Sequence, residues 1–263
     1  MFEIFWLVFA FLYGMILGSF TNVCIYRIPA NISLWTPPST CPVCNNLIKW
    51  YDNIPVLSYI ILGGKCRKCK TQISMQYPMV EMFTGFLVAL IYLKIGLSYD
   101  MIFLPLIVVM LITIAAIDYK TMIIPNGTVI ALAIIGGLYT ISRLIFPTEF
   151  VLQITWIEAL IGFFAASLPL FLVAVLSKGG MGGGDIKLMA AAGLFLGWKY
   201  ILVAMIVGSL IGAIISLTLI VLKIKKRKDM IPFGPFLCIG ILIAAAVGPE
   251  LVQWYTGIFT IIP

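Results

Sequence analysis

The run MIFLPLIVVMLITIAAID, residues 101–118, decides the fold class of this chain. Its first 17 residues carry no charge, which is the length of a helix that crosses the hydrocarbon core of a bilayer. The run ends in Asp118, and a charged side chain costs about 2.5–3.5 kcal/mol at mid-membrane on insertion scales. The sequence therefore predicts a membrane helix, and its acidic end is a candidate functional group.

The composition of the whole chain indicates the same class. Of its 263 residues 62% are hydrophobic and 10% charged, with a mean hydropathy of +1.14, whereas soluble domains are about half apolar and a quarter charged. The first apolar run, Phe2–Tyr26, lacks the basic leading region and the small-residue cleavage site of a signal peptide. We therefore expect it to span the membrane rather than to be cleaved off. The other apolar runs lie at 79–97, 126–146, 156–176, 200–222 and 232–260, with a shorter one at Ile186–Trp198. We expect an all-α polytopic membrane protein.

The basic residues decide whether the short run crosses the membrane. If it does, eight spans result, and the Lys and Arg residues divide 14 to 3 between the two sides, which satisfies the positive-inside rule. The majority side holds Arg27, Lys49, Lys65, Arg67, Lys68, Lys70, Lys120, Lys178, Lys187, Lys223, Lys225, Lys226, Arg227 and Lys228. The other side holds Lys94, Arg143 and Lys199. We expect about eight transmembrane helices, with the majority side in the cytoplasm and both termini outside.

This topology predicts three parts of the chain. Residues 1–26 form the first span, 27–78 a small cytoplasmic loop domain and 79–263 a membrane-embedded core of about seven spans. The net charge of +7 is then explained by topology, so we expect no nucleic-acid partner. The chain contains no histidine, which excludes Ser-His-Asp, Cys-His and H-E-x-x-H chemistry and leaves carboxylates or a Ser-Lys arrangement for hydrolysis.

A second acidic residue follows a glycine-rich segment. In KGGMGGGDIKLM, residues 178–189, five glycines in six residues precede Asp185 and provide a backbone that can pass close to a substrate strand. The expected topology places Asp118 and Asp185 at the same membrane boundary. Two carboxylates together could share one proton and hydrolyse a peptide bond. The alternative is that each Asp only ends a span near the headgroups.

Four cysteines form the other motif. Cys41-Pro-Val-Cys44 and Cys66-Arg-Lys-Cys69 are separated by 21 residues, close to the spacing of four-thiolate zinc sites. The loop is expected in the cytoplasm, where disulfides rarely persist. We therefore expect a structural Zn²⁺ site, with a redox dithiol or disulfide pair as the alternative. Cys24 and Cys238 lie in apolar runs and are expected to be small buried residues.

Five ordered segments of the chain resemble the type IV prepilin peptidase family. Asp118 with Ile124-Pro125-Asn126 matches its first aspartate motif, and Gly182, Gly183, Gly184 and Asp185 match its Gly-x-Gly-Asp core. A basic residue is frequent before the family's Tyr-Pro, where this chain has Gln76. The segments are GSFTNVCIYRIP (18–29), WYDNIPVLSYIILGGKCRKC (50–69), YPMVE (77–81), IDYKTMIIPN (117–126) and KGGMGGGDIKLM (178–189).

The resemblance implies a bifunctional membrane enzyme. It implies that Asp118 and Asp185 are catalytic, with Gly182, Gly183 and Gly184 as the active-site loop, and that the basic leader of prepilins or pseudopilins is removed at the cytoplasmic face. It also implies S-adenosylmethionine-dependent methylation of the new N-terminus, for which the sequence has no nucleotide fingerprint of its own. Glu81, near the edge of the second span, is a candidate for holding the cationic methyl donor or the new amine. A snorkelling edge residue is the alternative.

Two other functions use similar elements. An intramembrane-cleaving protease of the signal-peptide-peptidase kind also carries a Gly-x-Gly-Asp aspartate, but the chain has no Pro-Ala-Leu motif and such an enzyme has no place for the cysteine loop. A proton-coupled transporter, a different class, would use intramembrane acids and broken glycine-rich helices. Transporters usually show related halves, and no such repeat is visible in this sequence.

Overall fold

The computed structural model describes residues 2–146, 152, 154–177, 180–226 and 229–260. Predicted positions outside these ranges are Lys178 and Gly179 of the glycine-rich segment and Arg227 and Lys228 of the basic run. The described residues form helices and two isolated β-bridges but no strand, so the all-α prediction is confirmed. The chain divides into two compact units, residues 1–113 and 114–263. The division into 1–26, 27–78 and 79–263 stays a prediction.

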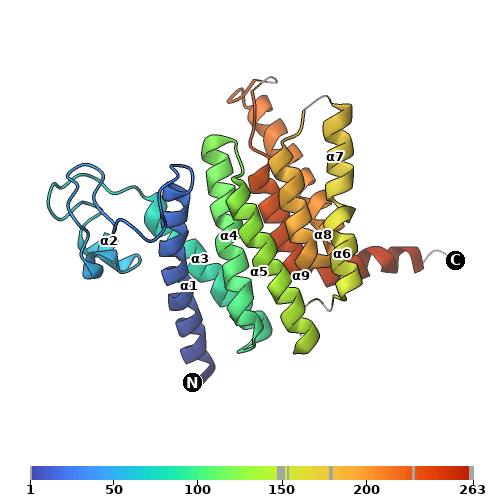
Figure 1. Cartoon of the computed structure of the whole chain (residues 1–263), viewed down its shortest axis with the longest axis horizontal. Helices are drawn as coiled ribbons and strands as arrows, with labels where there is room; N and C mark the ends of the chain where they lie inside the picture. Colours follow the sequence, from blue (N-terminus) through green and yellow to red (C-terminus); the bar gives the residue numbers. More distant parts are fainter. Residues whose placement is uncertain (1, 147–151, 153, 178–179, 227–228, 261–263) are drawn as a thin grey trace. The chain divides into compact units, whose positions relative to one another are not determined.

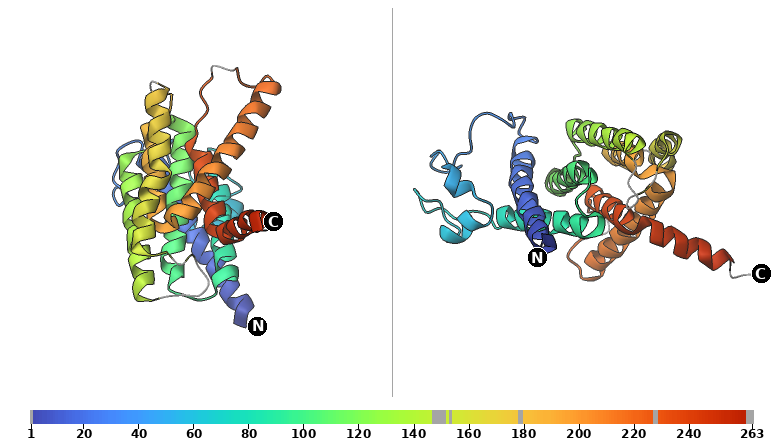
Figure 2. Two further views of the ribbon diagram at one scale, coloured as in Figure 1. Left: turned by 90° about the vertical axis from the view of Figure 1, so that its right-hand side faces the viewer. Right: turned by 90° about the horizontal axis from the view of Figure 1, so that it is seen from below.

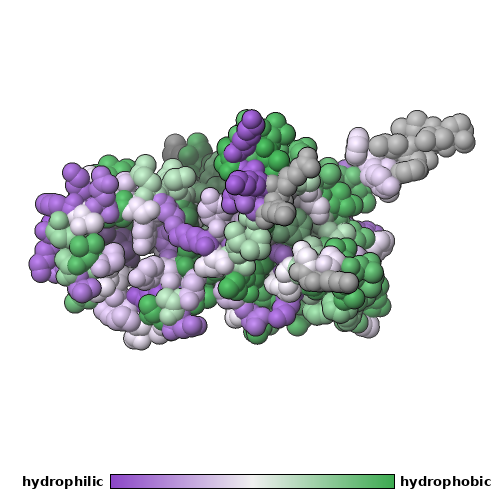
Figure 3. Space-filling model, turned by 90° about the horizontal axis from the view of Figure 1, so that it is seen from above, coloured by the Kyte–Doolittle hydropathy of each residue, from purple (hydrophilic) through white to green (hydrophobic). Residues whose placement is uncertain are grey.

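Seven helices of the described chain are long and apolar enough to cross a membrane (Figure 1). Large apolar side chains remain exposed along them, as expected of helices that face lipid. Figure 3 shows these hydrophobic residues over the helices, while hydrophilic residues gather over the 28–75 segment at the left of the view. The seven are α1 (Phe2–Arg27), α3 (Gln76–Ile95), α4 (Asp100–Thr121), α5 (Asn126–Ile145), the pair α6 (Trp156–Ala165) and α7 (Ser167–Leu176), α8 (Gly183–Val221) and α9 (Gly234–Thr260).

In the first unit α1 packs closely on α3 through small residues. A Cβ added at Gly14 would lie 2.8 Å from Gly85 Cα, and one at Gly18 would lie 2.7 Å from Glu81 Cα. Such contacts let two membrane helices approach where no hydrophobic effect drives them together. The loop between the helices contains a 3-10 turn, η1 (Trp50–Asn53), and the short α2 (Leu57–Ile61). The loop between Arg27 and Gln76 is thus attached at both ends to a closely packed helix pair.

In the second unit the 39-residue α8 reverses at Gly197, which has φ 69° and ψ 176°. Before this break Gly184 lies against Ile124, and Ile124 also lies near Gly234 at the start of α9. After it α8 runs antiparallel to α9: Gly248 packs on Tyr200, Gly240 on Ala204 and Gly208 on Phe236. The chain therefore crosses this unit twice within α8 (Figures 1 and 2). The expected short span, Ile186–Trp198, is the first of these two passes.

Candidate functional site

Asp118 lies in the last turn of α4, and its carboxylate meets the beginning of α9. Oδ2 accepts a 3.0 Å hydrogen bond from the backbone N–H of Gly234. The side chain is 5% exposed, so this contact is shielded from bulk water. A Cβ at Gly234 would lie only 2.7 Å from Asp118 Oδ2. A side chain at this position would thus force the Asp118 carboxylate to shift.

Asp185 lies in the first turn of α8, three residues after the N-cap Gly182. Its backbone N–H donates to Gly182 O at 3.2 Å, which closes the glycine-rich turn. Its side chain is 8% exposed, and a Cβ added at Gly182 would lie 3.1 Å from Oδ2. The glycine backbone thus passes directly beside the second carboxylate.

Ile124 brings the two aspartate-bearing segments together. A Cβ at Gly184 would lie 2.9 Å from Ile124 Cβ, and one at Gly234 would lie 3.1 Å from Ile124 Cδ1. The carboxyl groups of Asp118 and Asp185 consequently lie within electrostatic range of each other. The structure thus places the two acids predicted from sequence, 67 positions apart, in one site.

Lys187 makes a second connection at this site. Its Nζ donates a 3.0 Å hydrogen bond to Oδ1 of Asn126, which begins α5. Asn126 directly follows the Ile124-Pro125 pair, so the bond joins the two segments that already meet at Gly184. From the sequence, Asn126 is only part of a motif and Lys187 has no role beyond topology, so neither residue type reveals this bond.

Sequence reasoning missed the contribution of α9. From its composition the segment IPFGPF, residues 231–236, indicates only the start of the last apolar run. Its Gly234 acts through a backbone N–H, which no residue-type pattern reveals. The available signal was a glycine between prolines, Pro232 and Pro235, at the mouth of a membrane helix, where a special backbone position is expected.

The arrangement suits carboxylate chemistry. Two acids share a mostly buried site, one has a hydrogen-bond donor aimed at it, and a permissive glycine backbone runs beside the other. Like charges at close range disfavour ionisation of both carboxyls, so such a pair tends to hold one proton. A paired acid and base of this kind can activate water against a peptide carbonyl.

The four loop cysteines form a second candidate site, in the first unit. The sulfurs of Cys41, Cys44, Cys66 and Cys69 all lie within 4.8 Å of one another, and none of them forms a disulfide. Cys41 Sγ and Cys69 Sγ are 3.8 Å apart. Tetrahedral zinc with Zn–S bonds of about 2.3 Å would separate its sulfurs by about 3.8 Å. The cluster can therefore hold a metal ion, and its donor set and spacing fit zinc.

The two halves of the cluster have the same backbone geometry. In the first half the N–H of Cys41 donates to the carbonyl oxygen of Asn46, and the N–H of Asn45 donates to the carbonyl oxygen of Cys41. In the second half the N–H of Cys66 donates to the carbonyl oxygen of Thr71, and the N–H of Lys70 donates to the carbonyl oxygen of Cys66. A β-bridge closes each half, Thr40 with Leu47 and Lys65 with Gln72. Each Cys-x-x-Cys is therefore a separately closed knuckle.

Hydrogen bonds favour the thiolate form of two of these cysteines. The side chain and the backbone of Thr71 hydrogen-bond to Cys69 and lower the pKa of its thiol to about 6. Backbone hydrogen bonds from Cys44 and Val43 lower the pKa of Cys41. The pKa of Cys44 is instead raised to about 11, by burial and by hydrogen bonds to the other three thiols. Because the thiolate is the form that binds metals, Cys41 and Cys69 are the two cysteines best prepared for a cation.

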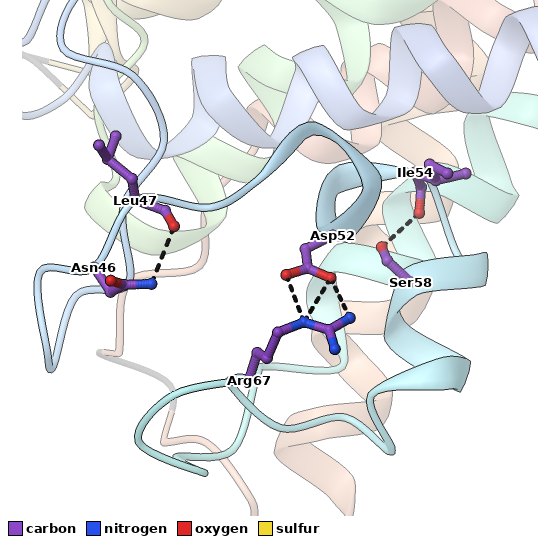
Figure 4. A network of polar contacts seen from close by, with 6 residues as sticks. All are labelled: Asn46, Leu47, Asp52, Ile54, Ser58 and Arg67. Carbon is purple, nitrogen blue, oxygen red and sulfur yellow. Dashed lines mark hydrogen bonds and ion pairs between the residues drawn. The ribbon is translucent and has the colours of Figure 1, made fainter.

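An ion pair ties the second knuckle to the 3-10 turn (Figure 4). Arg67 Nη2 lies 2.6 Å from Asp52 Oδ1, and Arg67 Nε donates to both oxygens of the same carboxylate. The guanidinium holds the pKa of Asp52 below its ordinary value. Figure 4 also shows the hydroxyl of Ser58, in the first turn of the short α2, donating a 2.6 Å hydrogen bond to the carbonyl oxygen of Ile54.

Glu81 connects the loop to the helix pair. Its Oε2 accepts the backbone N–H of Val56 at 2.8 Å, and its carboxylate also hydrogen-bonds the side chain of Ser19. Val56 has φ 60° and ψ −48°, a strained backbone for a β-branched residue, which persists only where its surroundings enforce it. The structure thus gives Glu81 an anchoring contact, and its part in holding a cation stays a prediction.

Comparison with known protein families identifies two matching segments that together cover most of the chain. The bacterial peptidase A24 N-terminal domain matches residues 12–95, and the type IV leader peptidase family matches 105–217. No solved structure matches the chain significantly. The second matched segment contains both aspartates of the candidate site.

Curated relatives cover nearly the whole chain. A Bacillus subtilis protein named prepilin leader peptidase/N-methyltransferase is 33% identical, over 93% of this chain and 96% of the relative. Proteins of the same name from Aeromonas salmonicida and Pseudomonas aeruginosa are 32% and 30% identical, over 95% and 93% of this chain and 94% and 91% of the relatives. These matches agree with a multi-pass membrane protein carrying two acids in one helical unit. The chain belongs to the type IV leader peptidase family.

Proposed function

We propose that this chain is a membrane aspartyl endopeptidase that removes the basic leader of type IV prepilins or pseudopilins. The convergence of Asp118 and Asp185 in one buried site supports this proposal most directly. Membership of the family and the names of the curated relatives support the substrate class. The family also makes an intramembrane-cleaving protease or a transporter the weaker explanation of the same acids.

The two carboxylates would divide the work of hydrolysis. One takes a proton from water as the water oxygen bonds to the peptide carbon, and the other gives its proton to the carbonyl oxygen. When the tetrahedral intermediate collapses, the first acid returns its proton to the leaving nitrogen and the C–N bond breaks. A hydroxyl proton then restores the second acid. Both carboxyls end in their starting states, so no further reactant is needed.

The glycine-rich turn would receive the substrate strand. A Cβ added at Gly182 would lie 3.1 Å from Asp185 Oδ2, and one added at Gly183 would meet nothing within 4 Å. A backbone without side chains lets an extended peptide approach the carboxylate closely. The active-site loop of Gly182, Gly183 and Gly184 thereby explains why the acid follows a glycine run.

We further propose that the chain methylates the new N-terminus with S-adenosylmethionine. This activity rests on the family and on the relatives' names. The buried carboxylate of Glu81, beside the metal loop, is our candidate for contact with the cationic donor or amine. When bound, the donor would supply the methyl group; the residues of this chain would bind it and the amine.

The metal of the loop is proposed to be zinc, held by Cys41, Cys44, Cys66 and Cys69. Four protein thiolates leave no open position for water, so the ion would be structural. We propose that the loop and both aspartates face the cytoplasm, on the side that carries 14 of the 17 basic residues. The leader of a prepilin would then be cut before its apolar segment enters the bilayer.

Purified protein in lipid vesicles tests the proposed function. A synthetic prepilin with a basic leader and an apolar segment is incubated with this protein, with and without S-adenosylmethionine. The masses of the products are then measured by mass spectrometry. We expect release of the leader in both cases and one added methyl group on the mature N-terminus only with the donor. An intact substrate would overturn the protease, and an unmethylated product would overturn the transferase alone.

A further inference from the structure

The two carboxylates of the site have different surroundings. Asp118 Oδ2 accepts the 3.0 Å hydrogen bond from Gly234 N–H. Within the ranges that the structure describes, the carboxyl of Asp185 accepts no hydrogen bond. A hydrogen bond from an N–H favours the charged form of a carboxyl group. The pair is therefore asymmetric before any substrate binds.

The donor to Asp118 belongs to a helix N-terminus. Gly234 opens the 27-residue α9, and Pro235, which has no N–H, follows it. The first N–H groups of a helix have no intrahelical partner, and the N-terminal end carries a partial positive charge. Because Asp118 is 5% exposed, water screens this interaction little. Both effects favour a negative charge on Asp118.

The other groups around the pair do not cancel this preference. Asp185, from α8, lies in the first turn of its own helix, where the dipole also favours charge, but its carboxyl has no hydrogen-bond donor among the described residues. The Cys238 thiol of α9 lies within electrostatic range of both acids and is neutral as a thiol. Lys187 directs its ammonium to Asn126. These surroundings favour placing the negative charge of the pair on Asp118.

We propose that the backbone N–H of Gly234 is a positioning group that keeps Asp118 ionised, so that Asp118 is the base and Asp185 the acid of the reaction. This inference rests on the proposed protease function and assigns the two roles that the pair alone leaves open. Asp118 takes the proton of the attacking water, and Asp185 gives its proton to the carbonyl oxygen. Gly234 acts only through Asp118 and touches no substrate.

Gly234→Ala tests the positioning role through a pH profile. The added Cβ would stand 2.7 Å from Oδ2 and push the carboxylate off the N–H. Without that bond Asp118 is harder to ionise, so the acid limb of kcat/KM should move up by about one pH unit, with part of the lost activity regained at higher pH. Gly137→Ala is the control, since a Cβ there meets nothing within 4 Å. An unmoved acid limb would overturn the proposal.

Infrared titrations of the single variants test the charge preference without activity. With its partner removed, each carboxyl titrates alone, so Asp118 in Asp185→Asn should lose its proton at lower pH than Asp185 in Asp118→Asn. The opposite order, or the same midpoint for both, overturns the assignment, and this test does not depend on whether Gly234→Ala folds. If the wild type cuts no prepilin, the proposed function fails, while these titrations still decide which carboxyl ionises first.

Discussion

The ammonium of Lys187 lies 3.0 Å from Oδ1 of Asn126 and joins the first turns of α8 and α5. The same two segments also meet where Gly184 packs on Ile124. Asp185 lies between Gly184 and Lys187 on α8, so a packing contact and a polar bond together fix the position of this turn. The segment that carries Asp185 is thus held at two points.

Removing either partner of this bond should weaken cleavage without abolishing it. We expect Lys187→Met and Asn126→Ala each to lower kcat by roughly fivefold, since an exposed charge-assisted hydrogen bond contributes about 1 kcal/mol. Steady-state cleavage of a prepilin by the double variant measures the coupling. If the two effects simply add, the residues do not act through their bond.

Loss of either aspartate should abolish hydrolysis. Asp118→Asn and Asp185→Asn are each expected to lower kcat by at least about 10²–10⁴-fold, because each removes a proton-transfer group. Expression and membrane insertion should be kept. Asp229→Asn is the matched control, as this acid is exposed and accepts the N–H of Lys226, outside the candidate site. Full activity in either active-site variant would refute the assignment.

The cysteine cluster should contain one zinc per chain. Cys44→Ser should lower the metal content below about half an equivalent and make residues 28–75 sensitive to protease, because the metal supplies much of the folding free energy of so small a domain. Elemental analysis and limited proteolysis measure both effects. Cys24→Ala, in the buried part of α1, should keep the full metal content. Disulfides and no metal in the wild-type protein would contradict the prediction.

Two substitutions of Glu81 distinguish its anchoring of the Val56 N–H from the proposed binding of a cation. Glu81→Ala should free the Val56 N–H and speed hydrogen exchange at residues 56–62, by roughly tenfold or more for the loss of a hydrogen bond to a charged group. Glu81→Gln keeps an oxygen that can accept the same bond, so exchange should stay near the wild-type rate. Methylation of the product is measured in parallel. A methylation defect in Glu81→Gln with normal exchange would favour the cation-binding role.

The reversal at Gly197 makes a prediction about topology. Met181→Cys and Lys225→Cys should react with a membrane-impermeant thiol reagent from the same side, and Lys199→Cys from the opposite side. The reason is that the chain passes through the unit once before Gly197 and once after it. Peptide mass mapping assigns each label. Opposite sides for positions 181 and 225 would mean a single crossing.

Much of this molecule could be predicted from its sequence, because its determinants are local or compositional. Apolar runs predict the membrane helices, and the division of basic residues predicts the short pass before Gly197, which hydropathy alone leaves open. The spacing of the cysteines predicts their cluster. The two aspartates stand out in the sequence because each lies at the edge of an apolar run.

Contacts made by the backbone could not be predicted in the same way. The N–H of Gly234 reaches a residue 116 positions away, and any residue type except proline has such a group. The unusual backbone of Val56 is accompanied by a hydrogen bond to Glu81, 25 positions away, against the preference of a β-branched residue. Such features depend on the assembled structure, so local propensity gives no sign of them.

The two knuckles of the loop have a kinetic consequence. Each is closed by its own backbone hydrogen bonds, and 21 residues tether one to the other. When one pair of thiolates dissociates from a bound ion, the other pair still holds the ion, and the tether gives the free pair an effective concentration in the millimolar range. Rebinding of the free pair then competes with complete dissociation of the ion. An ion in this cluster would therefore exchange slowly even where either half alone would release it quickly, and brief scarcity of metal outside would leave the loop folded.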